Sequence, residues 1–365
     1  MYQSWDELVA YRSRIRGCVL GGAIGDALGY PIEFLSLGAI RERFGAAGVT
    51  GLVPDHEGVT GRISDDTQMT LFTAEGVLGA YRRAAAKGIG GAETAMVMDA
   101  YLRWLDTQNH PAPPPRDGSL RHHSGWLREQ TWLYARRAPG NACLSGLREA
   151  HTPKPWGGLD GTPGPVNPDS KGCGTVMRSA PFGFTGAGAQ SSFELAARCA
   201  QITHGHPTGH YAAGALAAMI SRLVNGDSLE GAALRAMQVL ARYPGHEETT
   251  AALRKAIDLA AEGDPTPSMV ESLGAGWIAE EALAIALYAA LAGRTVEAAL
   301  LLSVNHSGDS DSTGAICGNL LGARHGDVRL PHDWLTRIEG RAVLTLLADD
   351  FAAEVNPGSG RVWNY

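Results

Sequence analysis

Two short acidic clusters near opposite ends of the 365-residue sequence carry the side chains best suited to metal chemistry. The first is the run Ser64-Asp65-Asp66-Thr67, which directly precedes an amphipathic stretch. One aspartate at the start of a helix is explained by capping and by the positive end of the helix dipole. Two aspartates flanked by hydroxyls also match a site for Mg²⁺, Mn²⁺ or Ca²⁺. Taken alone, this cluster favours the capping interpretation.

The second cluster, Gly308-Asp309-Ser310-Asp311-Ser312-Thr313, also leads into a predicted helix. Its D-x-D step puts alternate carboxylates on one side of an extended loop, and the following hydroxyl adds another oxygen. The segment lacks the remaining acids of a twelve-residue EF-hand loop, so that interpretation is poor. The cluster is compact enough to bind a hard cation.

A third acidic element consists of Asp26 and Glu33, on either side of the breaker pair Tyr30-Pro31. Asp26 lies among small residues in a helix that we expect to be buried, where a carboxylate must be hydrogen-bonded or paired with a charge. Glu33 lies beyond the turn and is better placed to move. From spacing alone, an ordinary surface acid is the more common explanation for Glu33.

Two glycine trios adjoin these acids and suggest how distant segments could meet. The trios, Gly21, Gly25 and Gly29 in the first and Gly314, Gly318 and Gly322 in the second, both have four-residue spacing. This spacing puts each trio on one helix face, where two helices can approach closely. Glycine costs about 1 kcal/mol in a helix interior relative to alanine. We therefore expect both faces to be closely packed at the centre of the fold.

Apolar residues recur mainly at helical spacing, and no convincing run of alternating strand residues occurs. Pro207 can start one helix, Asn225-Gly226 can end it, and Asp227-Ser228 precede the next. The sequence predicts an all-α fold, a compact multi-helix array forming a single domain over residues 1–365. The expected helices cover residues 6–29, 67–87, 92–106, 193–203, 208–225, 229–243, 247–262, 277–292, 295–304, 313–324 and 332–352.

The region 107–192 has a different composition, rich in proline, glycine, histidine and tryptophan. A loop region of this length inside a compact domain suggests a lid or a specificity region. The alternative is a disordered insertion, but Trp126, Trp132, Tyr134 and Trp156 supply aromatic side chains that can pack. Trp126 or Trp156 could stack on a substrate, although core packing is the more common role.

Composition limits the classes of function. Hydrophobic residues make up 44% of the chain, and its net charge of −7 provides no field for stable binding of a nucleic acid. The five cysteines are scattered without a zinc-ligand or C-x-x-C spacing, which suggests a reducing compartment. The N-terminal residues do not resemble a signal peptide, and no run of 18 apolar residues occurs. We therefore expect a cytoplasmic protein without a membrane segment.

Five segments together resemble the ADP-ribosylglycohydrolase family. In family order they are RGCVLGGAIGDALGYPIE at 16–33, SDDTQM at 64–69, GCGTVMRSAP at 172–181, THGHP at 203–207 and NHSGDSDSTG at 305–314. Each motif is weak by itself, but five in order across most of the chain are specific.

This resemblance implies an all-α fold with a binuclear Mg²⁺ or Mn²⁺ centre. The implied metal ligands are Ser64, Asp65, Asp66, Asp309, Asp311 and Ser312. Ser64 and Ser312 stand where the family often has threonine, and both keep the hydroxyl oxygen. The implied catalytic acids are Glu33, as a movable acid over the site, and Asp309.

The resemblance also implies a substrate-binding set. It consists of Asp65, Lys171, Gly172, Cys173, Gly174, Thr175, Val176, Met177 and His204. Glycines in such a loop expose backbone N–H groups that can cradle phosphate, although a glycine pair is usually only a turn. By resemblance the loop contacts the diphosphate and proximal ribose of ADP-ribose, and His204 contacts the ligand. His206 and His210 are expected to be structural.

These expectations describe a metal-dependent hydrolase that cleaves the ribose C1″ linkage of an ADP-ribosylated protein, small molecule or nucleobase and releases ADP-ribose. Two cations would bind the ribose hydroxyls and activate water, while Glu33 or Asp309 manages protons. One alternative is a metal-dependent nucleotide phosphoesterase. Another is a non-catalytic ADP-ribose-binding module, but such a module is expected to lack ligand oxygens, and here all of them are present.

Overall fold

The computed structural model describes residues 5–116 and 125–355 of the chain. Within these ranges all regular elements are helices and no β-strand forms apart from two isolated bridges, which confirms the predicted all-α class. The first four residues, part of the segment that argued against a signal peptide, lie outside the described ranges.

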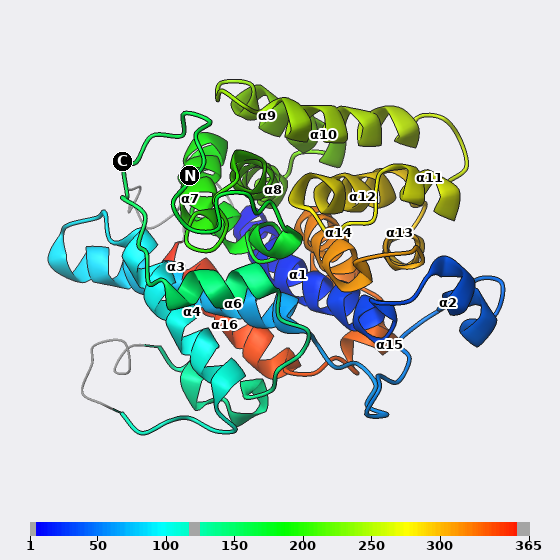
Figure 1. Ribbon diagram of the computed structural model, residues 1–365, viewed down its shortest axis with the longest axis horizontal. Helices are drawn as coiled ribbons and strands as arrows, with labels where there is room; N and C mark the ends of the chain where they lie inside the picture. The colour runs from blue at the N-terminus through cyan, green and yellow to red at the C-terminus, as the bar shows by residue number, and fades with distance from the viewer. Residues whose placement is uncertain (1–4, 117–124, 356–365) are drawn as a thin grey trace.

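The helices follow one another in the order shown in Figure 1. The α-helices are α1 (Trp5–Gly29), α2 (Leu37–Phe44), α3 (Asp65–Lys87), α4 (Glu93–Asn109), α6 (Asn141–Arg148), α7 (Gly188–Ala200), α8 (Pro207–Val224), α9 (Leu229–Leu240), α10 (Glu247–Ala260), α11 (Pro267–Ser272), α12 (Ala279–Ala292), α13 (Val296–Val304), α14 (Ser310–His325), α15 (His332–Leu335) and α16 (Arg341–Glu354). The short 3₁₀ turns are η1 (Tyr30–Ile32), η2 (Leu127–Glu129), η3 (Thr131–Leu133), η4 (Cys173–Thr175), η5 (Ala180–Phe184) and η6 (Asp327–Arg329).

The centre of the fold is the pair α1 and α14, which lie side by side in Figure 1. The two glycine trios form this interface. A Cβ atom added at Gly25 would overlap the carbonyl oxygen of Gly314, and one added at Gly318 would overlap that of Gly21. The order of these contacts makes the helices antiparallel. The predicted close packing is therefore confirmed, and its physical basis is direct contact between two backbones.

This pairing joins the end of one helix to the start of the other. A Cβ at Gly29, the last residue of α1, would overlap the backbone of Ser310, the first residue of α14. The segment that carries Asp309 and Asp311 therefore lies beside the turn that carries Glu33. Residues almost 280 positions apart, by the difference of their numbers 33 and 309, become neighbours.

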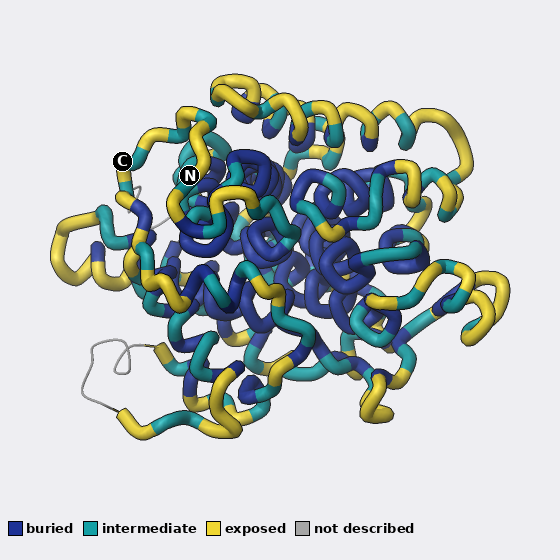
Figure 2. Tube along the Cα trace, in the orientation of Figure 1, coloured by how far each residue is buried: buried dark blue, intermediate teal, exposed yellow. Residues whose placement is uncertain are grey.

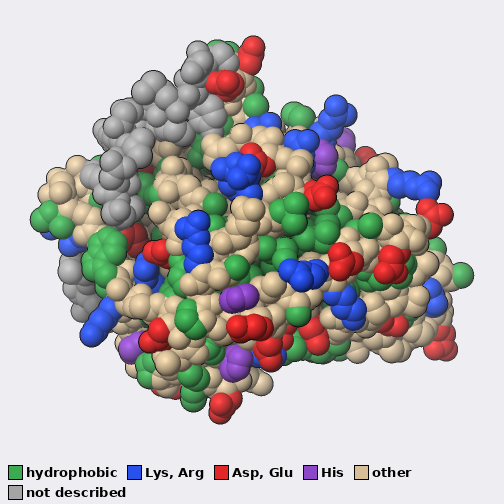
Figure 3. Space-filling model, turned by 90° about the horizontal axis from the view of Figure 1, so that it is seen from above, with side chains coloured by type: hydrophobic (Ala, Val, Ile, Leu, Met, Phe, Trp, Pro, Cys, Tyr) green, Lys and Arg blue, Asp and Glu red, His purple; other side chains and the backbone are tan. Residues whose placement is uncertain are grey.

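Other helices pack around the central pair. Nearly every residue of α8 and α12 is buried, in agreement with their alanine-rich sequences, which are apolar on all sides. By contrast, α9 and α10 lie at the outer edge and bury one face each, as the exposed outer surface in Figure 2 shows. On the face seen in Figure 3, acidic and basic side chains are interspersed.

Several predicted boundaries are confirmed. Pro207 is the first residue of α8, and Asn225 caps its end. Ser228 caps α9 by accepting a hydrogen bond from the Gly231 N–H at 3.1 Å. These local signals were sufficient because the capping groups satisfy backbone donors and acceptors within a few residues.

The prediction of one helix over 332–352 is wrong. Gly340 has a φ of +69°, which separates α15 from α16. Glu339, just before the break, donates its N–H to the Gly61 carbonyl at 2.8 Å and pairs with Arg137. Long-range partners therefore replace the helical hydrogen bonds that the local pattern favoured.

The helices α2, α6 and α11 were not predicted from sequence. Each has eight residues or fewer, so their apolar residues span too few turns to establish a period. Within 107–192, the described residues contain α6, the turns η2 to η5, the end of α4 and the start of α7, together with loops. Its role as a lid or specificity region stays a prediction.

No single helix in the described ranges is long and apolar enough to cross a membrane. The helical segments Trp5–Ile32 and Leu37–Phe44 together have the length and apolar composition of a membrane span, but an angle of 89° separates their axes.

Candidate metal centre and substrate cavity

A cavity of about 240 Å³ lies where the end of α1 and the starts of α3, α6 and α14 converge. Its lining residues are Glu33, Asp65, Asp66, Ala138, Gly140, Asn141, Ala142, Cys143, Gly172, Cys173, Gly174, Met177, His204, Trp277, Asp309, Asp311 and Ser312. The acidic clusters from the two ends of the sequence therefore share one cavity.

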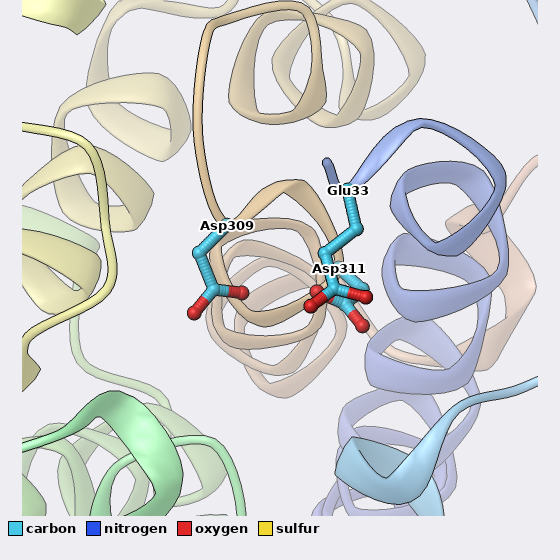
Figure 4. Close-up of side chains that lie close together, drawn as sticks. All are labelled: Glu33, Asp309 and Asp311. Atoms are coloured by element: carbon cyan, nitrogen blue, oxygen red, sulfur yellow. The ribbon is translucent and has the colours of Figure 1, made fainter. Parts of the chain in front are cut away.

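Three of the acids approach one another most closely. Glu33, Asp309 and Asp311 each offer a carboxylate oxygen, and these oxygens lie within 4.8 Å of one another. Figure 4 shows Glu33 on the loop that follows α1 and the two aspartates at the start of α14, with the carboxylates of Glu33 and Asp311 close together. Asp65 and Asp66 reach the same cavity from the start of α3.

Asp26 ties the first cluster to the central helix pair. Its carboxylate accepts the N–H of Ser64 at 2.9 Å and that of Thr67 at 3.1 Å, so the side chain caps the start of α3 from α1. This confirms the expectation that buried Asp26 is hydrogen-bonded. The Ser64 hydroxyl in turn donates to Asp66 Oδ2 at 3.4 Å. Asp26 thus ties the first acidic cluster to α1.

Electrostatics make this cavity strongly attractive to cations. Burial, followed by the charges of Asp311 and Asp309, raises the pKa of Glu33. Burial and neighbouring carboxylates likewise raise the pKa values of Asp65 and Asp66. No lysine or arginine lines the cavity among the described residues to offset this charge. A bound cation would lower each of these pKa values.

Unpartnered oxygens show that the donor set fits a metal. Glu33 Oε2 and Asp66 Oδ1 are buried and have no hydrogen-bond partner within the described part of the chain. A buried oxygen without a partner is costly, and a metal bond removes that cost. The nearby donors are carboxylate and hydroxyl oxygens, which suit Mg²⁺ or Mn²⁺ better than Zn²⁺. The residues present therefore fit a hard divalent cation.

The oxygens of Asp309 are more fully engaged than those of Glu33. Asp309 Oδ2 accepts a hydrogen bond from the Cys173 thiol at 2.8 Å, and Oδ1 accepts the Ser312 N–H at 3.3 Å. Burial, together with the charge of Asp309, raises the pKa of Cys173, so its thiol stays a protonated donor. Asp309 is therefore held in one orientation, whereas Glu33 has a free oxygen.

His204 contributes a neutral hydrogen-bond donor to the cavity. Arg178, only 1% exposed, donates to Thr203 Oγ1 at 2.7 Å, and this hydroxyl lies 2.7 Å from His204 Nδ1. Because the guanidinium can only donate, the hydroxyl proton is directed to Nδ1, which leaves the proton of the ring on Nε2. Burial lowers the pKa of His204 well below its usual value, and Arg178 adds to the effect.

Arg178 itself is unusual, because none of the ion pairs formed by the described residues includes it. Its guanidinium lies 4.6 Å from the centre of the Tyr101 ring and also contacts Cys143 Sγ at 3.5 Å. A buried guanidinium without an anion is costly. Its charge helps to lower the pKa of His204, which keeps that imidazole neutral.

The glycine loop keeps His204 accessible. A Cβ at Gly172 would lie 3.1 Å from His204 Nε2, and one at Gly174 would lie 2.7 Å from Cys143 Sγ. Side chains at these two positions would fill the space beside the imidazole. Gly172, Cys173, Gly174, Met177 and His204 all line the cavity, as the resemblance implied for a binding surface.

Four of the predicted site residues do not line the cavity. Ser64 and Val176 are fully buried, and Thr175 Oγ1 donates to the Gly172 carbonyl at 3.3 Å. The Lys171 ammonium bonds to Glu248 at 2.8 Å and to Glu280 at 2.5 Å. In this arrangement Lys171 anchors the loop to α10 and α12 instead of facing the cavity. His206 and His210 also lie outside the lining, in agreement with a structural role.

Sequence reasoning missed two parts of the lining. The segment 138–143 brings the start of α6 to the cavity, and Ala138 has a strained φ of +54°. The pair Gly140-Asn141 before Cys143, Leu144 and Leu147 was the available signal. The second is Trp277, which follows Gly276, a residue with a φ of +81°. Neither Trp126 nor Trp156 lines the cavity.

Comparison with known proteins agrees with this geometry. A family model described as ADP-ribosylglycohydrolase matches residues 7–360. The chain is 26% identical over 334 residues to the ADP-ribosyl-[dinitrogen reductase] glycohydrolase of Rhodospirillum rubrum, which covers 89% of this chain and 90% of that protein. It is 25% identical over 338 residues to the ADP-ribosylarginine hydrolase Tri1 of Pseudomonas putida, covering 92% of this chain and 77% of that protein.

A solved structure agrees as well. It is described as an ADP-ribosylglycohydrolase-related protein complex, and it superposes on this chain with a TM-score of 0.63 at 25% sequence identity. The match covers 95% of this chain and 99% of the other.

Proposed function

Since the chain belongs to the ADP-ribosylglycohydrolase family, we propose that it hydrolyses the ribose C1″ bond of ADP-ribosylated substrates and releases ADP-ribose. One observation carries the proposal. Carboxylates from both ends of the sequence line a single cavity that also contains a glycine loop and a neutral histidine donor. The substrate is expected to be an ADP-ribosylated protein, small molecule or nucleobase.

In this proposal two divalent cations, Mg²⁺ or Mn²⁺, are held by Ser64, Asp65, Asp66, Asp309, Asp311 and Ser312. The unpartnered oxygen of Asp66 and the raised pKa values of the aspartates support this ligand set. When bound, such cations act as Lewis acids that lower the pKa of a coordinated water and orient hydroxyl groups.

Glu33 is the better candidate for moving protons. Hydrolysis breaks the bond between C1″ and the acceptor atom, forms a bond from C1″ to the oxygen of water, and transfers a water proton to the departing acceptor. Glu33 Oε2 is buried without a partner, whereas both oxygens of Asp309 are engaged. A carboxylate with a free oxygen can accept that proton and release it again.

The remaining lining suits the anionic part of the substrate. The Nε2–H of His204 is a donor, and the start of α6 brings backbone N–H groups at the positive end of a helix dipole. Gly172 and Gly174 allow close approach of a ligand to the backbone. We assign the diphosphate and proximal ribose to this part of the cavity, with Asp65 contacting the ribose.

Metal removal and product analysis test the proposal. Protein stripped by a chelator should lose hydrolysis, and added Mg²⁺ or Mn²⁺ should restore it. Mass spectrometry should detect intact ADP-ribose as the product. Release of AMP and ribose phosphate would instead indicate a phosphoesterase. Metal-dependent binding of ADP-ribose without turnover of any ADP-ribosylated substrate would indicate a binding module, and full activity without metal would refute the metal mechanism.

A variant of Glu33 tests the proton assignment. Glu33→Gln keeps the size of the side chain and removes its ability to accept a proton. It should lower kcat by about 100-fold or more while leaving ADP-ribose affinity within a few-fold of wild type. The matched control is Glu42→Gln on the exposed surface of α2, which should leave kcat unchanged. A Glu33→Gln protein with wild-type kcat would transfer the role to Asp309.

A further inference from the structure

Two exposed aromatic side chains stack on each other beside the cavity. The ring centres of Phe34 and Trp277 lie 5.7 Å apart with an angle of 17° between the ring planes. Phe34 is 73% exposed and Trp277 is 42% exposed. Exposed apolar residues are common singly, but a contiguous aromatic pair at the edge of a functional cavity suggests a binding surface. We call Phe34 and Trp277 the aromatic pair.

The aromatic pair is fixed to the acidic part of the cavity. Phe34 directly follows Glu33, and Trp277 itself lines the cavity. The Trp277 carbonyl accepts the N–H of Cys173 at 3.1 Å, while the neighbouring Ala275 carbonyl accepts the N–H of Asp309 at 2.9 Å. The backbone therefore holds Trp277 between the glycine loop and the acids.

This position places the aromatic pair beside the acceptor group that departs from C1″, an inference that rests on the proposed function. C1″ of the substrate must lie next to the acids for hydrolysis to occur. The acceptor attached to C1″ must also remain connected to the rest of its molecule, so it extends from the acids toward solvent. An exposed surface that adjoins both Glu33 and Asp309 is where it would pass.

The chemistry beside the pair favours a planar cation. Glu33 is only 5% exposed, and its Oε2 has no hydrogen-bond partner among the described residues. Glu33 lies outside the proposed metal ligand set, so its carboxylate stays free to pair with a cation when metal is bound, and none of the described lining residues is a lysine or an arginine. A guanidinium group can stack its face on an aromatic ring and at the same time donate in-plane N–H bonds to a carboxylate. A serine acceptor can do neither.

We propose that Phe34 and Trp277 form a stacking platform that selects an arginine acceptor by its guanidinium group. Glu33 Oε2 would accept an N–H of that group in the bound substrate. A neutral nucleobase has the flat face but lacks the positive charge that the Glu33 carboxylate favours. The pair would thus act on the choice of acceptor and not on the binding of ADP-ribose itself.

The test compares two peptides of the same sequence that carry ADP-ribose on arginine or on serine. With Mg²⁺-loaded protein, Trp277→Leu should lower kcat/KM for the arginine peptide about tenfold, mainly through KM, as expected for loss of a partly desolvated cation–π contact. Phe34→Leu should have a smaller effect in the same direction. Trp277→Phe should restore most of the loss. The affinity for ADP-ribose, measured by calorimetry, should stay unchanged in all variants.

Trp156→Leu is the matched control, because Trp156 is 64% exposed but lies outside this cavity. This control variant should leave kcat/KM unchanged for both peptides. The proposed platform is overturned if Trp277→Leu leaves kcat/KM for the arginine peptide unchanged. It is also overturned if Trp277→Leu lowers kcat/KM for both peptides and the affinity for ADP-ribose by the same factor. Equal dependence on Trp277 for an ADP-ribosylated nucleobase would overturn the guanidinium assignment.

Failure of the proposed function gives a different result. A wild-type protein that hydrolyses no ADP-ribosylated substrate would refute the function. In that case the platform is judged by binding: wild type should bind ADP-ribosylarginine more tightly than ADP-ribose, and Trp277→Leu should reduce this difference. An unchanged difference would overturn the platform.

Discussion

Replacing Gly25 by alanine would test the contact that brings the two ends of the chain together. An added Cβ would lie 2.9 Å from the Ala315 nitrogen and closer still to the carbonyl oxygen of Gly314. Both neighbours are backbone atoms of a helix, so neither can rotate away. The added methyl group must therefore push α1 and α14 apart.

Two opposing effects determine how much Gly25→Ala changes the free energy of unfolding. Alanine in place of glycine favours a helix by about 1 kcal/mol. Overpacking typically costs about 1–3 kcal/mol, and a collision between two backbones belongs at the upper end or beyond. We expect Gly25→Ala to lower the free energy of unfolding by about 2 kcal/mol. Separating the helices also moves Glu33 from Asp309 and Asp311, so Mn²⁺ affinity should fall at least roughly tenfold.

Urea unfolding of metal-free protein measures the stability, and calorimetric titration with Mn²⁺ measures the affinity. Gly79→Ala in α3 is the matched control, because its Cβ would meet only the flexible end of Met96 at 3.0 Å. That variant should be as stable as wild type or more stable. Gly322→Ala, at the far end of the same helix pair, should be destabilised similarly but lose less Mn²⁺ affinity. If Gly25→Ala is as stable as Gly79→Ala, the close approach of the backbones is refuted.

Three further predictions concern the cavity. Asp311→Asn and Asp65→Asn should each lose bound metal and hydrolysis together, measured by metal analysis and turnover, and retention of both would remove that residue from the ligand set. Thr203→Val should weaken ADP-ribose binding about fivefold by calorimetry, since it removes the hydroxyl that joins Arg178 to His204, and Thr203→Ser should restore binding; unchanged affinity in Thr203→Val would refute the link. Burial raises the pKa of Asp26 to about 7, so the metal-free folded state holds a proton that the unfolded state releases near pH 4. Its stabilisation is therefore complete below about pH 4 and lost as pH rises through 7. Thermal unfolding between pH 4 and 8 should show this decline for metal-free protein and a Mg²⁺-induced stabilisation that grows with pH, and a Mg²⁺ effect independent of pH would contradict it.

Local patterns in the sequence determined much of the fold. Pro207, Asn225 and Ser228 mark helix boundaries because they act on backbone groups within a few residues. The four-residue spacing of the glycine trios identified both faces of the α1–α14 interface, since helical geometry alone puts such residues in one row. The acidic motifs could also be recognised from the sequence, because the oxygen ligands within each motif are adjacent in the chain.

Tertiary structure alone decided which of these residues meet. Nothing near Asp26 indicated that it caps α3, and nothing near Lys171 indicated that Glu248 and Glu280 bind its ammonium. The break at Gly340 and the stacking of Phe34 on Trp277 also depend on partners far away in sequence. A periodic pattern records which face of a helix is buried but not which other segment covers it. That choice is made by packing and charge in the folded chain.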